Sequence, residues 1–278
     1  MKIFVTGATG FIGKNFLKIA TESNNQIFAV TRKKNRSQNN SVKWLKGKIS
    51  DDWGKYLKKS DVLVHLAAEG VINKKTSLTK CLNFNVHETL KLLLSAYRSG
   101  CHKWIIIGSS SEYGETLSNK KLISKNDKPQ PLDNYSISKS ILCESSISIS
   151  KYLGVKLIYF RLFPVYGNGE NKNRLIPLIK SSAKKNRNFY IKNPYANIDY
   201  SEVKDVCRKI LGACEFQSNK NLFPQVWHLA SGNHTTIKNF ATKKWKLMGA
   251  KGKITFSKNN KEKVLHHISD KKSIWINK

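Results

Sequence analysis

The chain has 278 residues, 40% of them hydrophobic, so it can bury the core of one large α/β domain and a smaller lobe. Its five cysteines show neither metal-ligand nor redox spacing, which argues against a disulfide framework and predicts no metal site. The net charge of +32 does not favour a nucleic-acid partner, because only seven of the 50 basic residues are Arg and the Lys residues are dispersed.

No apolar run approaches the length of about 18 residues that a membrane-spanning helix requires. The N-terminus, MKIFVTGATG, enters a strand and a glycine turn directly and lacks the features of a signal peptide. We therefore expect a cytoplasmic protein that does not insert into a membrane.

Strands and helices are predicted to alternate through the first part of the chain. In chain order, hydrophobic patterning predicts strand 2–6, helix 11–20, strands 27–31 and 62–68, helix 86–97, strand 104–108, helix 135–150 and strand 155–160. This order is typical of a Rossmann-type doubly wound parallel sheet in the α/β class.

The pattern loosens from about residue 165 onward. Helices are expected at 175–183 and 203–212, and strands at 189–191 and 226–230. We expect a dinucleotide-binding Rossmann domain over 1–164, completed by parts of 195–232, and a smaller, interleaved C-terminal lobe over 165–278. Ligands of such sheets bind at the carboxyl ends of the strands, so functional residues are expected there.

A glycine turn follows the first strand, with Gly7, Gly10 and Gly13 at intervals of three. Glycine lets the backbone approach a pyrophosphate closely, and the free N–H groups and dipole of the following helix favour an anion. The sequence therefore predicts a bound dinucleotide.

The second strand ends in Thr31, Arg32 and Lys33, where an NAD-binding fold usually has an acid for the ribose 2′-hydroxyl. A basic pair can instead bind the 2′-phosphate of NADP. The sequence thus favours NADP over NAD as the cofactor, although a solvated Lys-rich turn is an alternative interpretation of these residues.

Tyr135 and Lys139 are four residues apart and share one face of a predicted helix. An ammonium beside a phenol is expected to lower the pKa of the phenol, as general acid–base chemistry requires. Ser109 follows the strand at 104–108, so its hydroxyl is expected at the carboxyl end of that strand.

These motifs together resemble the extended short-chain dehydrogenase/reductases, the NAD-dependent epimerase/dehydratase family. The matching segments are T-G-A-T-G-F-I-G at 6–13, H-L-A-A at 65–68, S-S-S-E-Y-G at 109–114 and Y-S-I-S-K at 135–139. The family usually has Asp at position 48, Gly at 88, Asn at 164 and Arg at 198, where this chain has Lys48, Glu88, Pro164 and Ile198.

The resemblance implies catalytic roles for Ser109, Tyr135 and Lys139. It implies cofactor contacts for Gly7, Thr9, Gly10, Phe11, Ile12, Gly13, Thr31, Arg32, Lys33, Lys48, Ile49, Leu66, Ala67, Ala68, Asn85, Tyr135, Lys139 and Phe163, with main-chain contacts near Ile49 replacing the missing Asp. It implies substrate contacts for Ser110, Ser111, Arg161, Pro164 and Arg174.

The resemblance implies a nucleotide-sugar substrate and a homodimer formed through paired helices. Ser110 and Ser111 occupy the positions of the acids that dehydratases use, which disfavours dehydration. Our first hypothesis is an NADPH-dependent reductase of a nucleotide-linked 4-keto-6-deoxyhexose. The alternatives are an NAD-dependent nucleotide-sugar 4-epimerase and a non-catalytic relative that binds RNA or senses NADP.

Overall fold

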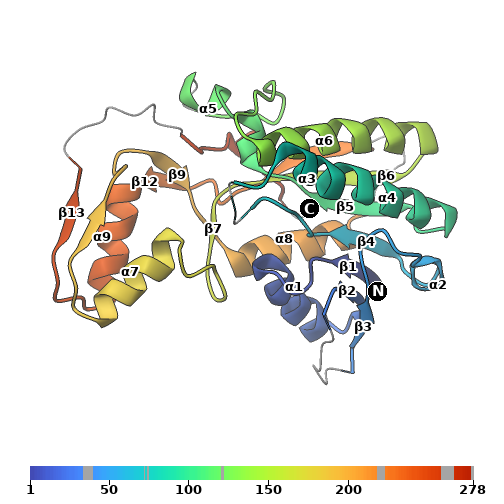
Figure 1. Cartoon of the computed structure of the whole chain (residues 1–278), viewed down its shortest axis with the longest axis horizontal. Helices are drawn as coiled ribbons and strands as arrows, with labels where there is room; N and C mark the ends of the chain where they lie inside the picture. Colours follow the sequence, from blue (N-terminus) through green and yellow to red (C-terminus); the bar gives the residue numbers. More distant parts are fainter. Residues whose placement is uncertain are drawn as a thin grey trace.

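The computed structural model describes residues 1–33, 40–71, 73, 75–119, 122–217, 223–257 and 266–276. Within these residues, seven strands form one parallel sheet in the order β3-β2-β1-β4-β5-β6-β11 (Figure 1). The strands are β1 (Lys2–Thr6), β2 (Gln26–Thr31), β3 (Val42–Lys46), β4 (Val62–His65), β5 (Lys103–Ile107), β6 (Lys156–Leu162) and β11 (Gln225–Leu229).

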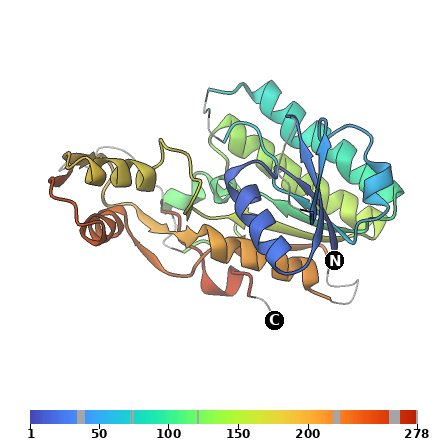
Figure 2. The ribbon, with the colours of Figure 1, turned by 90° about the horizontal axis from the view of Figure 1, so that it is seen from below.

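Helices cover both faces of this sheet, as Figure 2 shows. One face carries α1 (Phe11–Glu22) and α8 (Val203–Glu215), which pack against each other. The opposite face carries α2 (Gly54–Leu57), α3 (Leu78–Leu82), the π-helical turn η1 (Asn83–Glu88), α4 (Thr89–Arg98) and α6 (Asn134–Leu153). The predicted doubly wound Rossmann sheet is therefore confirmed.

The continuous hydrophobic strands follow from this double covering, because side chains on both faces of a parallel sheet are buried. In β1, Ile3 and Val5 belong to the core beneath α1 and α8, whereas Phe4 belongs to the core on the other face. All three side chains are fully buried.

A smaller lobe lies to one side of the sheet (Figure 1). It contains α7 (Leu175–Lys184), β8 (Phe189–Ile191), β9 (Asn197–Asp199), β12 (His234–Thr236), α9 (Ile237–Leu247) and β13 (Ile254–Phe256). Its own core consists of Ile179, Ala183, Ile191, Ala241 and Trp245. The short strands β7 (Val165–Tyr166) and β10 (Ser201–Glu202) pair where the chain passes between the two parts.

The last described segment, 266–276, returns from the lobe to the main sheet. It forms bridges from His267 to Ile198, from Ser269 to Ile123 and from Ile274 to His228, and includes the 3-10 turn η4 (Lys271–Ser273). Trp275 packs edge-on against Phe160, with the ring centroids 5.6 Å apart. This segment therefore passes close to the carboxyl ends of β6 and β11.

Three differences from the sequence-based expectation stand out. β3 was missed, because the half-exposed Val42–Lys46 alternates Lys with hydrophobic residues. The strand expected at 62–68 ends at His65. The helix expected at 86–97 is preceded by α3 and η1. No helix among the described residues is long and apolar enough to cross a membrane.

Candidate active site

The glycine turn after β1 brings three segments of backbone into close contact. Gly7 has φ +71°, and a Cβ at this position would lie 2.5 Å from the amide nitrogen of Ala67. A Cβ on Gly13 would collide with the carbonyl oxygen of Gly7. Glycine is thus required at both positions to let the turn pass between α1 and the loop after β4.

The N-terminus of α1 has the properties of an anion site. Gly10 is its N-cap, no side chain caps it, and its first turn contains no acid. Thr9 and Gly10 are exposed, and Phe11 and Ile12 are half-buried at the start of the helix. A 12-residue helix with an open N-terminus fits the pyrophosphate of a dinucleotide.

The carboxyl end of β2 carries the predicted adenosine contacts. The Thr31 hydroxyl donates to the carbonyl oxygen of Lys33 at 3.0 Å, which folds the chain back at this corner. Arg32 and Lys33 are exposed. The corner thus offers two exposed cations to a ribose or its phosphate.

Lys48 lies in the loop after β3, and its main chain is hydrogen-bonded within that loop. Its amide donates to Asp51 Oδ2 at 2.8 Å, and its carbonyl oxygen accepts from Trp53 Nε1 at 2.9 Å. Its side chain is exposed, whereas Ile49 is buried. The cofactor contacts expected of Lys48 and of the main chain near Ile49 both stay predictions.

The loop after β4 is held by Asn85. Its side chain accepts from the amide of Glu69 at 2.8 Å and donates to Ser138 Oγ at 2.8 Å, which ties the loop to α6. Leu66, Ala67 and Ala68 are half-buried beside it. Asn85 is therefore placed to organise the cofactor loop.

Ser109, Tyr135 and Lys139 come together beyond the carboxyl end of β5. Ser109 opens the 3-10 turn η2 (Ser110–Tyr113), and Tyr135 lies in the first turn of α6. Burial raises the pKa of Tyr135 well above its ordinary value, and Glu112 raises it further. A hydrogen bond from the Ser109 hydroxyl opposes this rise in the pKa.

Lys139 lies one helical turn further along α6 and is 1% exposed. Within the described residues its Nζ has no hydrogen-bond partner. Burial lowers the pKa of Lys139 to about 8, against an opposing effect of Glu112. An ammonium with three unused donors fits the hydroxyls of a ribose, so the residues present suit a dinucleotide cofactor.

The expected lowering of the Tyr135 pKa by Lys139 is not seen. Burial and Glu112 are the first two causes acting on the phenol, and both raise its pKa. In a buried environment the charged phenolate is disfavoured, so Tyr135 is held in its protonated form.

Glu112 is the residue of this site that the sequence reasoning missed. It is fully buried, and its Oε1 accepts from the Ser109 amide and from the Tyr159 hydroxyl, each at 2.8 Å. Its Oε2 accepts from Arg161 Nε at 3.0 Å. Ser109 and Glu112 form a capping box, and the pattern S-x-x-E was the signal that could have revealed it.

Arg161 was expected to contact substrate, and the structure corrects this. Its side chain is 4% exposed and forms an ion pair with Glu112. Its Nη1 donates to the Tyr113 hydroxyl at 2.9 Å and to the carbonyl oxygen of Lys125 at 3.1 Å. Arg161 is a structural residue beneath the site.

Ser110 and Phe163 are also buried. Ser110 is 2% exposed, and its hydroxyl lies 3.0 Å from Nδ1 of His267 in the returning C-terminal segment. Phe163 is 1% exposed and packs against His228, with ring centroids 4.9 Å apart. Burial thus removes the Ser110 side chain from the substrate candidates and the Phe163 side chain from the cofactor candidates.

The remaining substrate candidates are more accessible. Ser111 and Pro164 are half-buried, and Arg174 is exposed at the start of α7. Arg174 Nε lies 3.9 Å from Glu170 Oε1, and its charge lowers the pKa of Tyr135, although burial outweighs this effect. The substrate contact expected of Arg174 stays a prediction.

An aromatic cluster lies where the chain enters the smaller lobe, and Lys244 Nζ is 4.6 Å from the centroid of its Tyr166 ring. The rings of Tyr200 and Phe240 stack with centroids 4.3 Å apart and an angle of 15°, and Tyr166 meets Phe240 edge-on. Burial raises the pKa of Tyr200 to about 12, and Arg174 opposes this. The lobe thus presents a cation next to flat aromatic surface.

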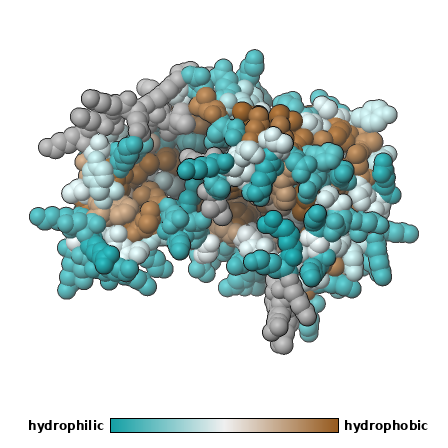
Figure 3. Space-filling view, in the orientation of Figure 1, coloured by the Kyte–Doolittle hydropathy of each residue, from teal (hydrophilic) through white to brown (hydrophobic). Residues whose placement is uncertain are grey.

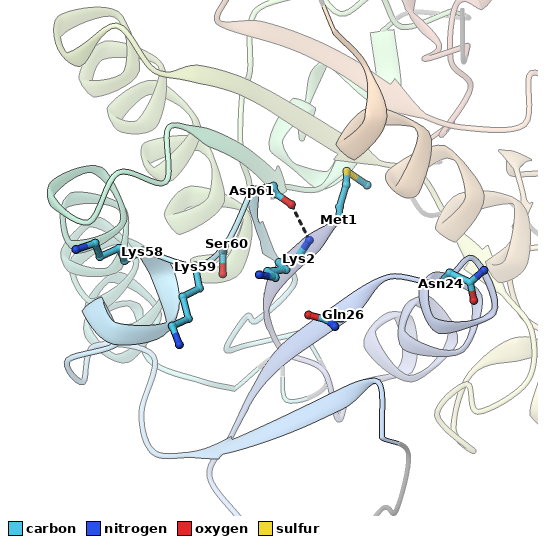
Figure 4. A pocket seen from close by; sticks show the side chains of 8 residues that line it. All are labelled: Met1, Lys2, Asn24, Gln26, Lys58, Lys59, Ser60 and Asp61. Carbon is cyan, nitrogen blue, oxygen red and sulfur yellow. Dashed lines mark hydrogen bonds between the residues drawn. The ribbon is translucent and has the colours of Figure 1, made fainter.

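The depression drawn in Figure 4 lies at the opposite end of the sheet's strands from Ser109 and Tyr135. It has a volume of about 640 Å³ and is lined by Met1, Lys2, Asn24, Gln26, Lys58, Lys59, Ser60 and Asp61. These residues lie at or near the amino ends of β1, β2 and β4. Because ligands of such sheets bind at the carboxyl ends, we assign the site to Ser109, Tyr135 and Lys139 instead.

The chain combines a seven-stranded Rossmann sheet, a glycine turn after its first strand, and Ser109, Tyr135 and Lys139 as candidate catalytic residues. These features define the class of NAD(P)-dependent short-chain dehydrogenases. Residues 3–226 match the profile of the NAD dependent epimerase/dehydratase family. The chain belongs to this family and is an enzyme of the extended type.

Two curated relatives are similar in sequence. A GDP-6-deoxy-D-talose 4-dehydrogenase of Aggregatibacter actinomycetemcomitans is 29% identical over 211 residues, which cover 74% of this chain and 68% of that protein. A UDP-glucose 4-epimerase of Vibrio cholerae is 29% identical over 176 residues, covering 62% of this chain and 54% of that protein. The chain thus spans between about half and two thirds of these relatives.

A solved structure shares the fold. The UDP-glucuronic acid 4-epimerase of Bacillus cereus, in complex with UDP-glucuronic acid and NAD, superimposes with a TM-score of 0.82 at 21% identity. The superposition covers 97% of this chain and 90% of that one.

Proposed function

We propose that this enzyme transfers a hydride between a nicotinamide cofactor and a nucleotide-activated sugar, and that its reaction is the NADPH-dependent reduction of a nucleotide-linked 4-keto-6-deoxyhexose. The observation that carries the proposal is the hydrogen-bonded pair of Ser109 and Tyr135, with Lys139 one turn further along α6 and its Nζ buried without a hydrogen-bond partner among the described residues. All three lie at the carboxyl edge of the sheet, where a carbonyl would meet them.

The chain's own residues account for the proton chemistry of a reduction. NADPH supplies the hydride when it is bound. Tyr135, held protonated by its raised pKa, donates its proton to the oxygen of the former carbonyl. Ser109 orients that oxygen by hydrogen bonding, and Lys139 holds the cofactor ribose.

The cofactor preference rests on the corner at the end of β2. Arg32 and Lys33 are exposed there, and Thr31 occupies the place of the acid that binds a ribose 2′-hydroxyl. This supports NADP over NAD, although the Bacillus cereus relative holds NAD.

The substrate assignment rests on the lobe and on the relatives. Arg174 can take a phosphate, and the stacked Tyr200 and Phe240 offer aromatic surface. The curated relatives act on GDP-linked and UDP-linked sugars by their names. Ser110 and Ser111 stand where dehydratases of the family carry acids, which disfavours dehydration.

A second candidate is an NAD-dependent nucleotide-sugar 4-epimerase, which the likeness to a UDP-glucose 4-epimerase supports. An epimerase returns the hydride to its substrate and consumes no cofactor. A reductase oxidises one NADPH per product. Measuring NADPH absorbance and the sugar product in the same reaction therefore distinguishes the reductase from the epimerase.

We also propose that the chain forms a homodimer. Figure 3 shows hydrophobic residues gathered over the face that carries α3, α4 and α6. On α6, Ile141 is 40% exposed and Tyr152 is 90% exposed. Sedimentation analysis measures the mass of the purified protein in solution, and we expect that of a dimer. The mass of a monomer at all concentrations would contradict the proposal.

The nucleotide is tested by thermal shift with UDP, GDP, CDP and dTDP in the presence of NADPH. We expect at least one nucleoside diphosphate to raise the melting temperature, because it fills half of the substrate site, and we expect the shift to shrink as salt rises. Stabilisation by a short RNA and by none of the nucleotides would favour the RNA-binding alternative.

A further inference from the structure

The smaller lobe carries charge of one sign only. Its two segments, 171–198 and 232–257, contain 13 of the 50 Lys and Arg residues of the chain and none of its 18 Asp and Glu residues. The rest of the chain mixes both signs. The general richness of the chain in lysine therefore does not account for the lobe, because the acids that accompany lysine elsewhere are missing from these two segments.

The ends of the two helices of the lobe meet at one place. α7 and α9 each lead through a short loop into a strand, and these strands, β8 and β13, begin next to each other in parallel. The Phe189 amide donates to the carbonyl oxygen of Lys253 at 2.9 Å. A Cβ on Gly252 would lie 2.6 Å from the carbonyl oxygen of Arg187. The two loops therefore form one continuous surface.

We call residues 184–188 and 246–253 the tip of the lobe. Leu247 is 71% exposed and Met248 is 36% exposed there. None of the basic residues of the tip forms an ion pair with another described residue. The tip thus combines exposed apolar side chains with six exposed cations, which are Lys184, Lys185, Arg187, Lys246, Lys251 and Lys253.

This composition fits the surface of an anionic bilayer. Lysines attract acidic headgroups without a fixed geometry, and five of the six cations are lysines. Exposed side chains such as Leu247 and Met248 contribute by entering the headgroup layer, whereas they offer nothing to the phosphates of a nucleic acid. The tip lies at the end of the lobe away from the main sheet, where a flat surface can reach it (Figures 1 and 2).

We propose that the tip is a docking surface for a bilayer of anionic phospholipids, with its lysines at the headgroup phosphates and Leu247 at the headgroup layer. The association is peripheral and reversible, because no helix of the described residues can cross a membrane and few apolar side chains of the tip are exposed. It goes beyond the proposed reduction and does not depend on it.

The test is co-sedimentation of the purified protein with vesicles of phosphatidylcholine, alone or with an equal amount of phosphatidylglycerol. We expect binding to the anionic vesicles only, and release as salt rises. Replacing Lys246, Lys251 and Lys253 together by Gln should weaken binding about 100-fold, at about fivefold for each charge. Leu247→Ser keeps the charge and should weaken binding about tenfold.

Matched controls lie outside the lobe. Replacing Lys55, Lys58 and Lys59 together by Gln removes the same number of exposed charges from the main domain and should leave vesicle binding unchanged. Ile276→Ser removes an apolar side chain that is 68% exposed and should also have no effect. The melting temperature and dinucleotide affinity of each variant show whether it is folded.

Failure of the unmodified protein to bind anionic vesicles, or equal losses in the tip variant and in its main-domain control, would overturn the proposal. Binding of a short RNA that the tip lysines support, with no binding of vesicles, would also overturn it and would assign the tip to nucleic acid. The vesicle measurement uses neither cofactor nor sugar, so its failure is distinct from a failure of the reductase assignment.

Discussion

At the scale of single residues, the site combines a protonated phenol with a buried ammonium. Burial raises the pKa of Tyr135 and lowers that of Lys139 to about 8. Because desolvation disfavours the charged form of each group, the two shifts have opposite directions. Such a pair suits a reaction in which the enzyme gives a proton to a developing alkoxide.

Replacing Tyr135 by Phe should abolish turnover and leave cofactor affinity nearly unchanged, because only the transferable proton is lost. We expect a fall in kcat of at least about 100-fold, the lower end of the range for general acid catalysis. Steady-state kinetics and dinucleotide titration of the same preparation measure both quantities. Turnover near the original rate would show that another group supplies the proton.

Replacing Arg32 by Ala should narrow the preference for NADPH over NADH. Loss of one charge-assisted contact to the 2′-phosphate is expected to cost about 1–3 kcal/mol of NADPH binding and little of NADH binding. Fluorescence titrations at one ionic strength give the two dissociation constants. Equal affinities for both cofactors in the unmodified protein would favour the epimerase.

At the scale of elements, the sequence predicted the parts that continuous or periodic hydrophobicity marks. The strands of the sheet other than β3, the helices α1, α6 and α8, and the glycine turn were all expected within a few residues. β3 escaped because its lysines interrupt the hydrophobic run. The helix and strand that carry Ser109, Tyr135 and Lys139 were predicted correctly, because Ser109 directly follows a buried strand and Tyr135 opens a helix.

The environment of Arg161 could not be predicted in the same way. Whether a side chain at a strand end faces the cleft or the core depends on contacts from distant segments. Arg161 is held by Glu112, 49 positions away, and Ser110 is held by His267, 157 positions away. No local pattern reports contacts over such separations.

The first turn of α6 depends on its capping box. Asp133 Oδ1 accepts from the Ser136 amide at 2.7 Å, and Ser136 Oγ accepts from the Asp133 amide at 3.0 Å. Asp133→Ala should lower the free energy of unfolding by about 0.5–2 kcal/mol. Urea unfolding measures this, with Glu144→Ala as the matched exposed control, which should change it by less than about 0.5 kcal/mol. Equal effects of the two substitutions would contradict this role.

At the scale of the whole molecule, the buried His65 and His228 and the half-buried His267 link the sheet to the segments that cross it. Burial is the main cause that lowers the pKa of His65 and His228 to about 3 and that of His267 to about 4. His228 bonds the Tyr113 hydroxyl and, at 2.8 Å, Ser269 Oγ. The returning C-terminal segment is thus joined to the site through neutral imidazoles.

Because the pKa values of these histidines are lowered, we expect the protein to lose stability in mild acid. Unfolded histidine binds a proton below about pH 6.5, whereas the folded forms stay neutral to about pH 4, so acid favours the unfolded chain. Between pH 7.5 and 5.5 each should cost about 1 kcal/mol of unfolding free energy. Urea unfolding across this range measures the slope, and His267→Gln should flatten it by about one third. A slope that is independent of His267 would refute this explanation.

We propose that Ser109, Tyr135 and Lys139 carry out the reduction of a nucleotide-linked keto-sugar by NADPH. The most direct measurement mixes the purified protein with NADPH and nucleotide-linked 4-keto-6-deoxyhexoses carrying each of the common bases, and follows NADPH absorbance and sugar product together. The account predicts one NADPH oxidised per 4-hydroxy product with the unmodified protein and none with Tyr135→Phe. Interconversion of 4-hydroxy sugars without net loss of NADPH would contradict it and would establish the epimerase instead.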